Sequence, residues 1–378
     1  MSAPWPTLQF DEAVEDASGG NIKTKQNDYA EVGEFPIIDQ GKALIAGYTD
    51  DEAALCKVPL PVVIFGDHTR CLKFVDFPFG MGADGVKVLK PKAGLDAKFL
   101  YHYLRQIKLP DGGYDRHFKY LKRETVPLPP LEEQRRIAAI LDQAETLRTQ
   151  RRTALALLDS LTQSLFLDMF GDDDKGEPRF AVAALADVLE MPLQNGAYYP
   201  KEEYVSEGGV EMVHMSDAFN GIVGRGSLKR VNCSDADLSK YGLNESDILL
   251  ARRSLTYEGA AKPCLVPPAA EPLIFESSFI RVTPDRKKLS VPYLFHYLDN
   301  PTIRDKRVRP FVTQSTISGI NQSNLERVAV VVPPLPLQQT FATRIAAIEA
   351  LKATHRRALA ALDALFASLQ QRAFTGAL

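Results

Sequence analysis

The chain has 378 residues, a formal net charge of −3 and 45% hydrophobic residues, a length that suits two or more domains with cores of their own. The composition is that of a soluble globular protein. No apolar run approaches the roughly 18 residues of a membrane span, and the acidic N-terminal segment does not resemble a signal peptide. The four cysteines show no metal-binding spacing. We therefore expect a cytoplasmic protein without a metal or a disulfide scaffold, in which any basic surface is local.

Residues 1–128 predict the first globular domain. Short β-branched or aromatic runs at residues 62–65 and 86–89, separated by Gly and Pro, are typical of strands joined by turns. Residues 80–85 match the GxGxxG pattern, but a strand-like run follows where a dinucleotide site needs a helix N-terminus. A turn or loop is expected there instead.

Residues 129–172 predict one long amphipathic helix, which begins just after a Pro-Pro pair and stops near Gly171. Its apolar residues recur at steps of three and four, as in the seam of a coiled coil. The same segment recurs at an offset of 204, so the chain contains a duplication. We expect the two helices to pair with each other, with solvated single helices as the alternative. The expected pairing residues are Ile137, Leu141, Leu147, Leu155, Leu158 and Leu165 in the first helix, and Phe341, Ile345, Leu351, Leu359, Leu362 and Leu369 in the second.

Residues 173–332 predict a second globular domain, reached through a polar linker at residues 172–177 and followed by the second long helix at residues 333–378. Strand-like runs lie at residues 247–250 and 279–282. Residues 293–298 resemble residues 99–104, so the globular parts are also related. The predicted fold is α+β, with two globular domains, two long helices and a pseudo-two-fold repeat.

Sequence motifs for catalysis are missing. There is no GxxxxGK[ST] phosphate loop, GxSxG, HExxH or kinase set, and no glycine loop for S-adenosylmethionine. Pro284-Asp285 with Lys287 is only a fragment of a nuclease motif. His102 and His296 recur on apolar helices, which favours a structural role. The absence of these motifs indicates a binding and architectural protein.

Two stretches in equivalent parts of the repeats are basic. Residues 98–123 contain seven Lys/Arg and two Asp, and residues 281–310 contain eight Lys/Arg and three Asp, which gives +5 in each. Aromatic and amide side chains lie among these charges. Lys and Arg neutralise phosphates, while Arg, Gln, Asn and His read base edges, so the paired stretches favour double-stranded DNA as the ligand.

The sequence resembles the specificity subunit of Type I restriction-modification systems. The resemblance rests on residues 126–142, VPLPPLEEQRRIAAILD, which are similar to the family's entry into its first conserved helix. Residues 66–70 and 82–86 resemble one subtype of its target recognition domain, and residues 247–256 and 276–282 resemble another. The second copy departs from the helix-entry motif, because Pro336-Leu337-Gln338 replaces Glu-x-Gln; the helix itself is still expected.

The resemblance implies a non-catalytic subunit in phage defence and DNA methylation. In this family two target recognition domains, separated by two long antiparallel coiled-coil helices, each read half of a bipartite site. The helices dock two modification (methyltransferase) subunits, which carry S-adenosylmethionine and methylate adenine, and restriction/translocase subunits add cleavage. This chain would itself hold no cofactor, and its two dissimilar domains imply an asymmetric target.

Loop position and charge select the DNA-binding candidates. His68, Arg70 and His117 in the first domain and Arg253, Thr256 and Gln314 in the second are predicted to contact bases. Lys119, Lys122, Lys287 and Lys288 are predicted to contact phosphates. Two other classes of function stay open: a nuclease with a degenerate active site, and a coiled-coil scaffold that binds DNA without reading its sequence.

Overall fold

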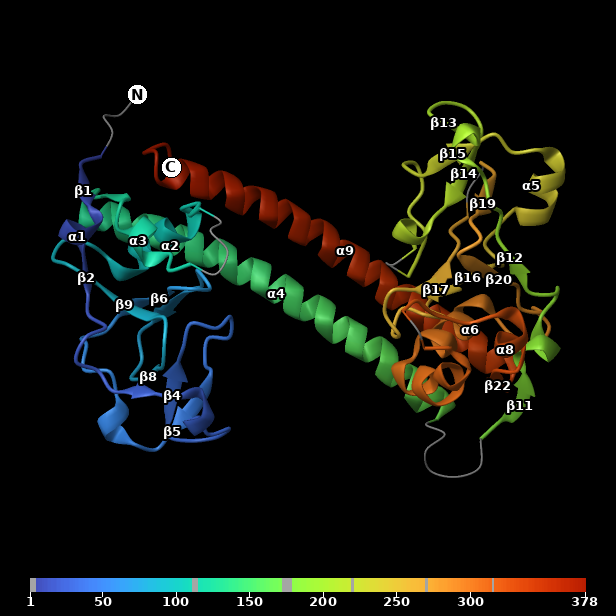
Figure 1. The fold of residues 1–378 in the computed structure, drawn as a ribbon, viewed down its shortest axis with the longest axis horizontal. Helices are drawn as coiled ribbons and strands as arrows, with labels where there is room; N and C mark the ends of the chain where they lie inside the picture. The colour runs from blue at the N-terminus through green and yellow to red at the C-terminus, as the bar shows by residue number, and fades with distance from the viewer. Residues whose placement is uncertain (1–4, 111–114, 172–178, 219–220, 269–270, 315) are drawn as a thin grey trace. The chain divides into compact units, whose positions relative to one another are not determined.

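The computed structural model describes residues 5–110, 115–171, 179–218, 221–268, 271–314 and 316–378. The chain forms two compact units: unit 1 comprises residues 1–154 and 355–378, and unit 2 comprises residues 155–354. Helices α4 (Leu131–Phe170) and α9 (Leu335–Ala373) run through both units (Figure 1). Each unit thus holds one globular domain and part of each long helix. The linker predicted at residues 172–177 lies outside the described residues.

The core of unit 1 lies between an antiparallel sheet, helix α2 and the long helices. The sheet has the order β2-β9-β6-β7, and a second sheet has the order β3-β8-β4-β5. The Asp96 carboxylate accepts the first free N–H groups of α2, whose buried Phe99 and Leu100 belong to the same core as Ile137 and Leu141 of α4. The elements are β1 (Thr7–Gln9), α1 (Phe10–Ala13), β2 (Val14–Asp16), β3 (Lys23–Thr24), β4 (Phe35–Ile38), β5 (Gly47–Thr49), β6 (Val62–Gly66), β7 (Leu72–Val75), β8 (Gly80–Gly82), β9 (Val86–Pro91), α2 (Ala97–Gln106), α3 (Phe118–Leu121) and β10 (Thr125–Pro127).

Unit 2 repeats this plan. Its antiparallel sheet has the order β12-β20-β16-β18, and its second sheet the order β13-β15-β14-β19. Helix α6, capped by the Ser290 hydroxyl, adds Tyr293 and Leu294 to a core that includes Phe166 of α4 and Phe341 of α9. The elements are β11 (Ala181–Ala184), β12 (Gln194–Asn195), β13 (Tyr204–Val205), β14 (Val210–Val213), β15 (Lys229–Val231), α5 (Asp235–Tyr241), β16 (Ile248–Ala251), β17 (Arg253–Ser254), β18 (Pro263–Leu265), β19 (Leu273–Phe275), β20 (Phe279–Val282), α6 (Val291–Asp299), α7 (Pro301–Ile303), β21 (Ser318–Gly319), α8 (Gln322–Glu326) and β22 (Ala329–Val332).

The predicted strands at residues 62–65, 86–89 and 279–282 form, and the run at residues 247–250 forms one residue later as β16. The expectation of a loop at residues 80–85 is wrong for its first half, because Gly80–Gly82 is strand β8. The buried strand pairs with β3 and β4. A strand then follows the motif as β9, and no helix does.

Both long helices start at equivalent residues and carry a buried glutamine four residues after the second proline of each Pro-Pro pair. In unit 1 the Gln134 amide donates to the carbonyls of Gly94 and Pro129 and accepts the N–H of Asp96. In unit 2 Gln338 makes the same set of bonds with Lys288, Pro333 and Ser290. The altered residues 336–337 therefore leave the helix start unchanged at Leu335.

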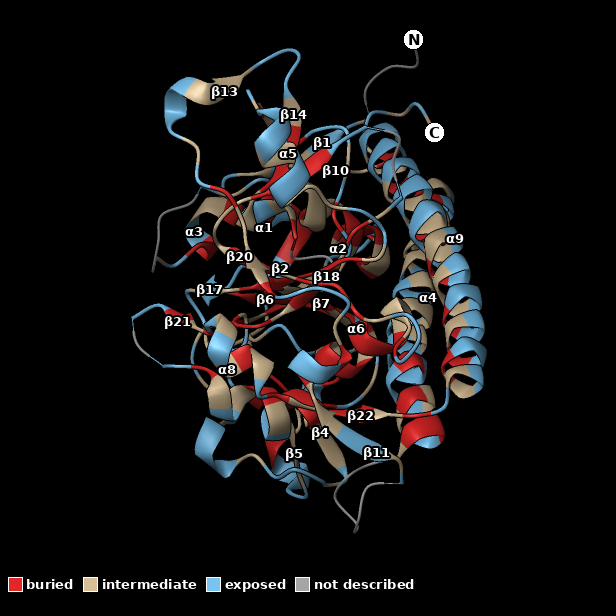
Figure 2. Ribbon diagram, turned by 90° about the vertical axis from the view of Figure 1, so that its right-hand side faces the viewer, coloured by how far each residue is buried: buried red, intermediate tan, exposed pale blue. Residues whose placement is uncertain are grey.

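The long helices pack antiparallel within each unit. In unit 1 Arg136 of α4 bonds the C-terminal residue Leu378, while Arg148 bonds Asp363. In unit 2 Phe170 stacks edge-on against Phe341, whereas Asp159 pairs with Lys352. Since rising numbers in α4 meet falling numbers in α9, the directions are opposed. Figure 2 shows exposed residues along much of both helices.

The seam buries Ile137, Leu141, Phe341 and Ile345 and half-buries Leu155, Leu158, Leu165, Leu359, Leu362 and Leu369. The prediction is wrong for Leu147 and Leu351, whose side chains are 38% and 50% exposed. The seam positions beside them are taken by Arg148, which lies over the Phe366 ring, and by the buried Lys352. A spacing of three or four residues fits Leu147 or Arg148 in α4, and Leu351 or Lys352 in α9. The sequence pattern favours the leucine at each place because it is apolar.

Candidate nucleic-acid interface

One loop occupies the same topological position in both units. In unit 1 a turn at residues 67–71 joins β6 to β7, and in unit 2 a longer loop at residues 252–262 joins β16 to β18. The two sheets have matching strand orders, so these connections are equivalents in the repeat. His68 and Arg70 lie in the first connection, and Arg253 and Thr256 lie in the second. All four are predicted base contacts, and their loops correspond in the two units.

A second segment lies beside each of these loops and leads into a short helix. In unit 1 the N–H of His117 donates to the Asp67 carbonyl at 2.8 Å, just before α3. In unit 2 the N–H of Ile320 donates to the Arg252 carbonyl at 3.0 Å, just before α8. The bonded carbonyl belongs to the first residue after the central strand in both cases. Each unit thus builds one two-segment surface from distant parts of its chain.

The turn of unit 1 presents a strained arginine. Arg70 is exposed and has a φ of +61°, in the left-handed region that non-glycine residues seldom adopt. Its N–H bonds the Gly66 carbonyl, which closes the turn. His68 is half-buried, and its ring Nδ1 lies 3.2 Å from the Asp115 carbonyl. Strain of this kind at an exposed loop is a sign of a functional residue.

His117 has a different environment from the one predicted. Its side chain is 1% exposed, and Nδ1 lies 3.1 Å from the Asp67 carbonyl. Because the ring lies inside the domain, it has no surface from which to reach a base. Its role here is to help hold the second segment against the turn.

The lysines predicted to bind phosphate in unit 1 are exposed and form ion pairs. Lys119 lies 2.8 Å from Asp115, and Lys122 lies 3.3 Å from Asp11. Hydrogen bonds from Lys119, the Arg116 N–H and Tyr120 lower the pKa of Asp115 to about 2. Exposed pairs of this kind contribute little stability, so these lysines can exchange a carboxylate partner for a phosphate.

A polar hollow of about 300 Å³ adjoins the turn of unit 1. It connects to the turn through Gln40, whose side-chain oxygen accepts the His68 N–H and whose carbonyl accepts the Thr69 hydroxyl. Gly85, beside the Gln40 side chain, has a φ of +77°, a conformation that favours glycine. Sequence reasoning missed this hollow, although three consecutive polar residues at 25–27 were a signal. The lining residues are Lys25, Gln26, Asn27, Tyr29, Asp39, Gln40, Ala83 and Asp84.

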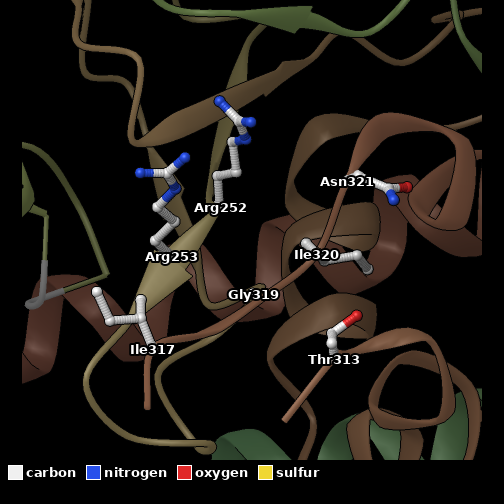
Figure 3. A pocket seen from close by; sticks show the side chains of 7 residues that line it. All are labelled: Arg252, Arg253, Thr313, Ile317, Gly319, Ile320 and Asn321. Carbon is white, nitrogen blue, oxygen red and sulfur yellow. The ribbon is translucent and has the colours of Figure 1, made fainter. Parts of the chain in front are cut away.

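Unit 2 has a hollow of about 330 Å³ on its own two-segment surface. Arg252 and Arg253 line it from β17 and the residue before it, with Ile317 next to Arg253 and Thr313 farther away (Figure 3). Arg253, Thr256 and Gln314 are all exposed, and the first and last belong to segments joined by the β17–β21 pairing. The hollow adds residues that were not predicted: Arg252, Thr313, Ile317, Gly319, Ile320 and Asn321.

The predicted basic stretches are less basic in the folded chain than their composition suggests. Lys98 pairs with Asp142 at 2.6 Å. Arg304 is 6% exposed and donates to the carbonyls of Glu258, Ala260 and Ala261. Partners from distant elements, which a local count omits, thus neutralise or bury several of these charges.

The other two predicted phosphate contacts lie apart from the unit 2 hollow. Lys287 is exposed, and the Lys288 ammonium donates to the Asp187 carbonyl at 2.7 Å. Both precede α6, and the Lys288 carbonyl is bonded by Gln338 at the start of α9. Neither lines the hollow.

Within the described ranges, no group of three or more His, Cys, Asp or Glu side chains is placed to hold a metal ion. Over the same residues, no helix has the length and apolar character needed to cross a membrane.

Comparison with known proteins gives one consistent family. The model of the Type I restriction modification DNA specificity domain matches residues 5–156 and 179–363. The chain is 24% identical over 272 residues to the Type I restriction enzyme EcoKI specificity subunit of Escherichia coli K12, covering 67% of this chain and 57% of that protein. It is 27% identical over 113 residues to the EcoR124I/EcoR124II specificity subunit of Escherichia coli, covering 28% of each. The chain thus spans less than two thirds of either relative's length.

Two solved structures have a similar fold. The Type I restriction-modification system S subunit from M. genitalium aligns with a TM-score of 0.63 and 14% identity, over 99% of this chain and 96% of that one. A chain from a study of complex assembly and conformational transition in the type I R-M system aligns with a TM-score of 0.54 and 17% identity, over 100% and 99% of the two chains.

Proposed function

Because this chain belongs to the family of Type I restriction modification DNA specificity domains, we propose that it is the DNA-recognition subunit of a Type I restriction-modification system. The observation that carries the proposal is the repeated surface: each unit places a loop after its central strand beside the segment that leads into α3 or α8. Two equivalent reading surfaces in one chain suit a bipartite DNA site, one half for each unit.

The target is proposed to be asymmetric because the two surfaces differ in size and chemistry. The turn of unit 1 spans residues 67–71 and adjoins a hollow with two acidic side chains, Asp39 and Asp84. The loop of unit 2 spans residues 252–262 and bears two arginines. Donors and acceptors arranged so differently fit different base edges.

Base contacts are assigned to exposed and half-buried residues of the loops, and phosphate contacts to the exposed lysines. Arg70 and His68 would read the first half-site, and Arg253, Thr256 and Gln314 the second, joined by Arg252 and Asn321 from the hollow. Arg suits guanine, and Gln and Asn suit adenine. The predicted phosphate contacts remain Lys119, Lys122, Lys287 and Lys288. His117 is left out because it is buried.

Two equivalent apolar pairs on the long helices support docking of two modification subunits. Leu147 and Leu365 are exposed in unit 1, at the same level of the helix pair, as the adjacent Arg148–Asp363 bond indicates. Their equivalents at the offset of 204, Leu351 and Leu161, are exposed in unit 2 beside the Lys352–Asp159 pair. Exposed apolar residues at repeated positions favour two like partners.

In this proposal the catalytic chemistry belongs to the partners. The modification subunits would bind S-adenosylmethionine and methylate adenine, and restriction subunits would add cleavage. The chain itself would recognise DNA in the cytoplasm without a cofactor or catalytic role.

The test is base-resolution methylation mapping of DNA from cells that express this chain with its modification subunits. A single bipartite, asymmetric methylated sequence is expected. Methylation without a sequence preference would favour the scaffold function, and metal-dependent cleavage by the purified chain alone would favour the nuclease. Either result would overturn the proposal.

A further inference from the structure

We propose that Leu255 of unit 2 is a specificity-determining residue that contacts the C5-methyl group of a thymine in the second half-site. The inference rests on the proposed function and deepens it by naming one chemical feature of the target. Leu255 lies in the loop after β16, and its side chain is 86% exposed. Among the described residues no large apolar side chain is more exposed.

The backbone holds Leu255 at the end of a short ladder. Arg253 pairs with Gly319 and Ser254 pairs with Ser318, antiparallel. The next positions along this register are Leu255 and Ile317, which is itself 50% exposed. Facing positions in an antiparallel ladder bring side chains together. Two apolar side chains therefore project from the free end of a fixed ladder, which the fold does not use for its core.

Ile317, which faces the position of Leu255 in this register, lies among side chains that fit the edges of base pairs. Arg252, Arg253, Thr313 and Asn321 line the hollow that Ile317 also lines (Figure 3). Arg, Thr and Asn are the side chains that hydrogen-bond base edges in the major groove, where thymine alone among the four bases presents a methyl group. An apolar side chain among such neighbours has the methyl group as its complementary feature.

The equivalent turn of unit 1 offers no counterpart. Residues 67–71 are Asp, His, Thr, Arg and Cys, so this turn lacks a leucine or isoleucine. The contact proposed for Leu255 therefore has no leucine or isoleucine equivalent in this turn.

The experiment exchanges single thymines for uracil in the mapped duplex, which removes only the C5-methyl group. The complete complex of this chain with its modification subunits is titrated with each duplex. For the unaltered chain, one uracil in the second half-site should weaken binding about fourfold, the effect of burying one methyl group. Leu255→Ala should weaken binding to the thymine duplex by at least as much and should no longer distinguish thymine from uracil at that position.

Two further variants are controls for effects of substitution other than loss of the apolar contact. Leu255→Met keeps an apolar side chain of similar reach and should retain discrimination at that position. Val182→Ala alters an apolar residue that is 43% exposed on β11, outside both reading segments, and should behave as the unaltered chain. The inference fails if Leu255→Ala still distinguishes thymine from uracil as the unaltered chain does, or if no uracil has an effect. If the complex of the unaltered chain binds all duplexes equally, whatever their sequence, the proposed function itself is refuted.

Discussion

Gln134 and Gln338 show how a single residue can survive a change in its surroundings. Both side chains are fully buried, and each satisfies one N–H and two carbonyls at the junction of a short helix with a long one. The repeated Pro-Pro-Leu and the glutamine can be seen in the sequence, but the pattern does not show which groups the glutamine amide bonds. Those bonds explain why residues 336–337 could diverge while Gln338 did not.

Removal of this amide should destabilise unit 2. Gln338→Ala leaves the buried Pro333 carbonyl and the partly buried Ser290 N–H and Lys288 carbonyl without their partner, which costs about 1–3 kcal/mol for each group that water does not reach. Gln338→Glu has the same shape but brings a carboxyl group against two carbonyl oxygens, and we expect it to be destabilising too. Urea unfolding measures both, with the exposed neighbour Gln339→Ala as the control. A Gln338→Glu variant as stable as the unaltered chain would contradict the assignment of these bonds.

Burial of His296 should make stability depend on pH. Burial beside Phe295 and Phe341 lowers the pKa of the His296 imidazole to about 4, while the unfolded chain has its ordinary value near 6.5. The unfolded state therefore binds the proton first as pH falls. The stabilisation is complete above pH 6.5 and is lost progressively towards pH 4, by up to about 3 kcal/mol.

His296→Phe removes the titrating group and should flatten this dependence. The measurement is the urea midpoint at pH 7 and pH 5, followed by circular dichroism, with His355→Gln on α9 as the control for substitution of another histidine. An unchanged difference between the two pH values in His296→Phe would assign the dependence to other groups.

Base and phosphate contacts should separate in binding experiments. Arg253→Ala should cost about 1–3 kcal/mol on the cognate duplex and relax the second half-site, as Arg70→Ala should relax the first. Lys287→Ala should weaken cognate and scrambled duplexes alike and reduce the salt dependence by about one counterion. Equal loss on cognate and scrambled DNA for Arg253→Ala would make it a phosphate contact.

At the scale of elements, the sequence predicted the long helices well and their contacts only in part. Helix length follows from local periodicity, so α4 and α9 begin and end near the predicted residues. Which stripe faces inward depends on the partner. Arg148 and Lys352 lie in the seam, each paired across it with an aspartate, Asp363 or Asp159. Leu147 and Leu351 lie outside the seam. The sequence alone does not show this, because it depends on how the two helices pair.

The exposed leucines should matter for assembly and not for folding. Leu147→Glu places a charge in the proposed docking pair of unit 1, and one of the two modification subunits should then dissociate. Native mass spectrometry of the complex measures the ratio. Thr149→Glu adds the same charge at an exposed position two residues along, on a different face of the helix, and should leave the ratio at two to one. If the Leu147→Glu variant still binds two modification subunits, the docking surface lies elsewhere.

At the scale of the whole molecule, duplication makes the helix contacts self-complementary. Arg148 and Lys352 are equivalents at the offset of 204, and so are Asp159 and Asp363. The Arg148–Asp363 bond of unit 1 therefore has a counterpart in two copies of the first repeat, between Arg148 of one copy and Asp159 of the other. The loop surfaces diverged and could not be derived from the sequence, because contacts between distant segments build them. The helix pairing retained the symmetry of the duplication.

We therefore predict that a fragment of residues 1–174 forms an isologous dimer. Without its mate, the first helix would leave its apolar seam in water, and a second copy can cover it. With the modification subunits, the dimer should methylate a palindrome made of the first half-site twice, since two-fold protein symmetry requires a two-fold target. Sedimentation gives the oligomeric state, and methylation mapping gives the target. A well-folded monomer, or a dimer that keeps the asymmetric target, would contradict the two-unit interpretation.

One position should limit the strength of this dimer. In unit 1 the buried Phe366 packs beneath Arg148, and its equivalent in the first repeat is Thr162. The dimer of the fragment has two equivalent sites of this kind, and each would lack the ring that Phe366 provides in unit 1 of the full chain. Thr162→Phe should restore them and tighten dimerisation at least tenfold, since each buried ring adds about 1.5–3 kcal/mol. Gln163→Phe, at the exposed neighbouring position, should leave the dissociation constant unchanged. Equal effects of the two variants would show that the fragment associates through a surface other than the repeated helix seam.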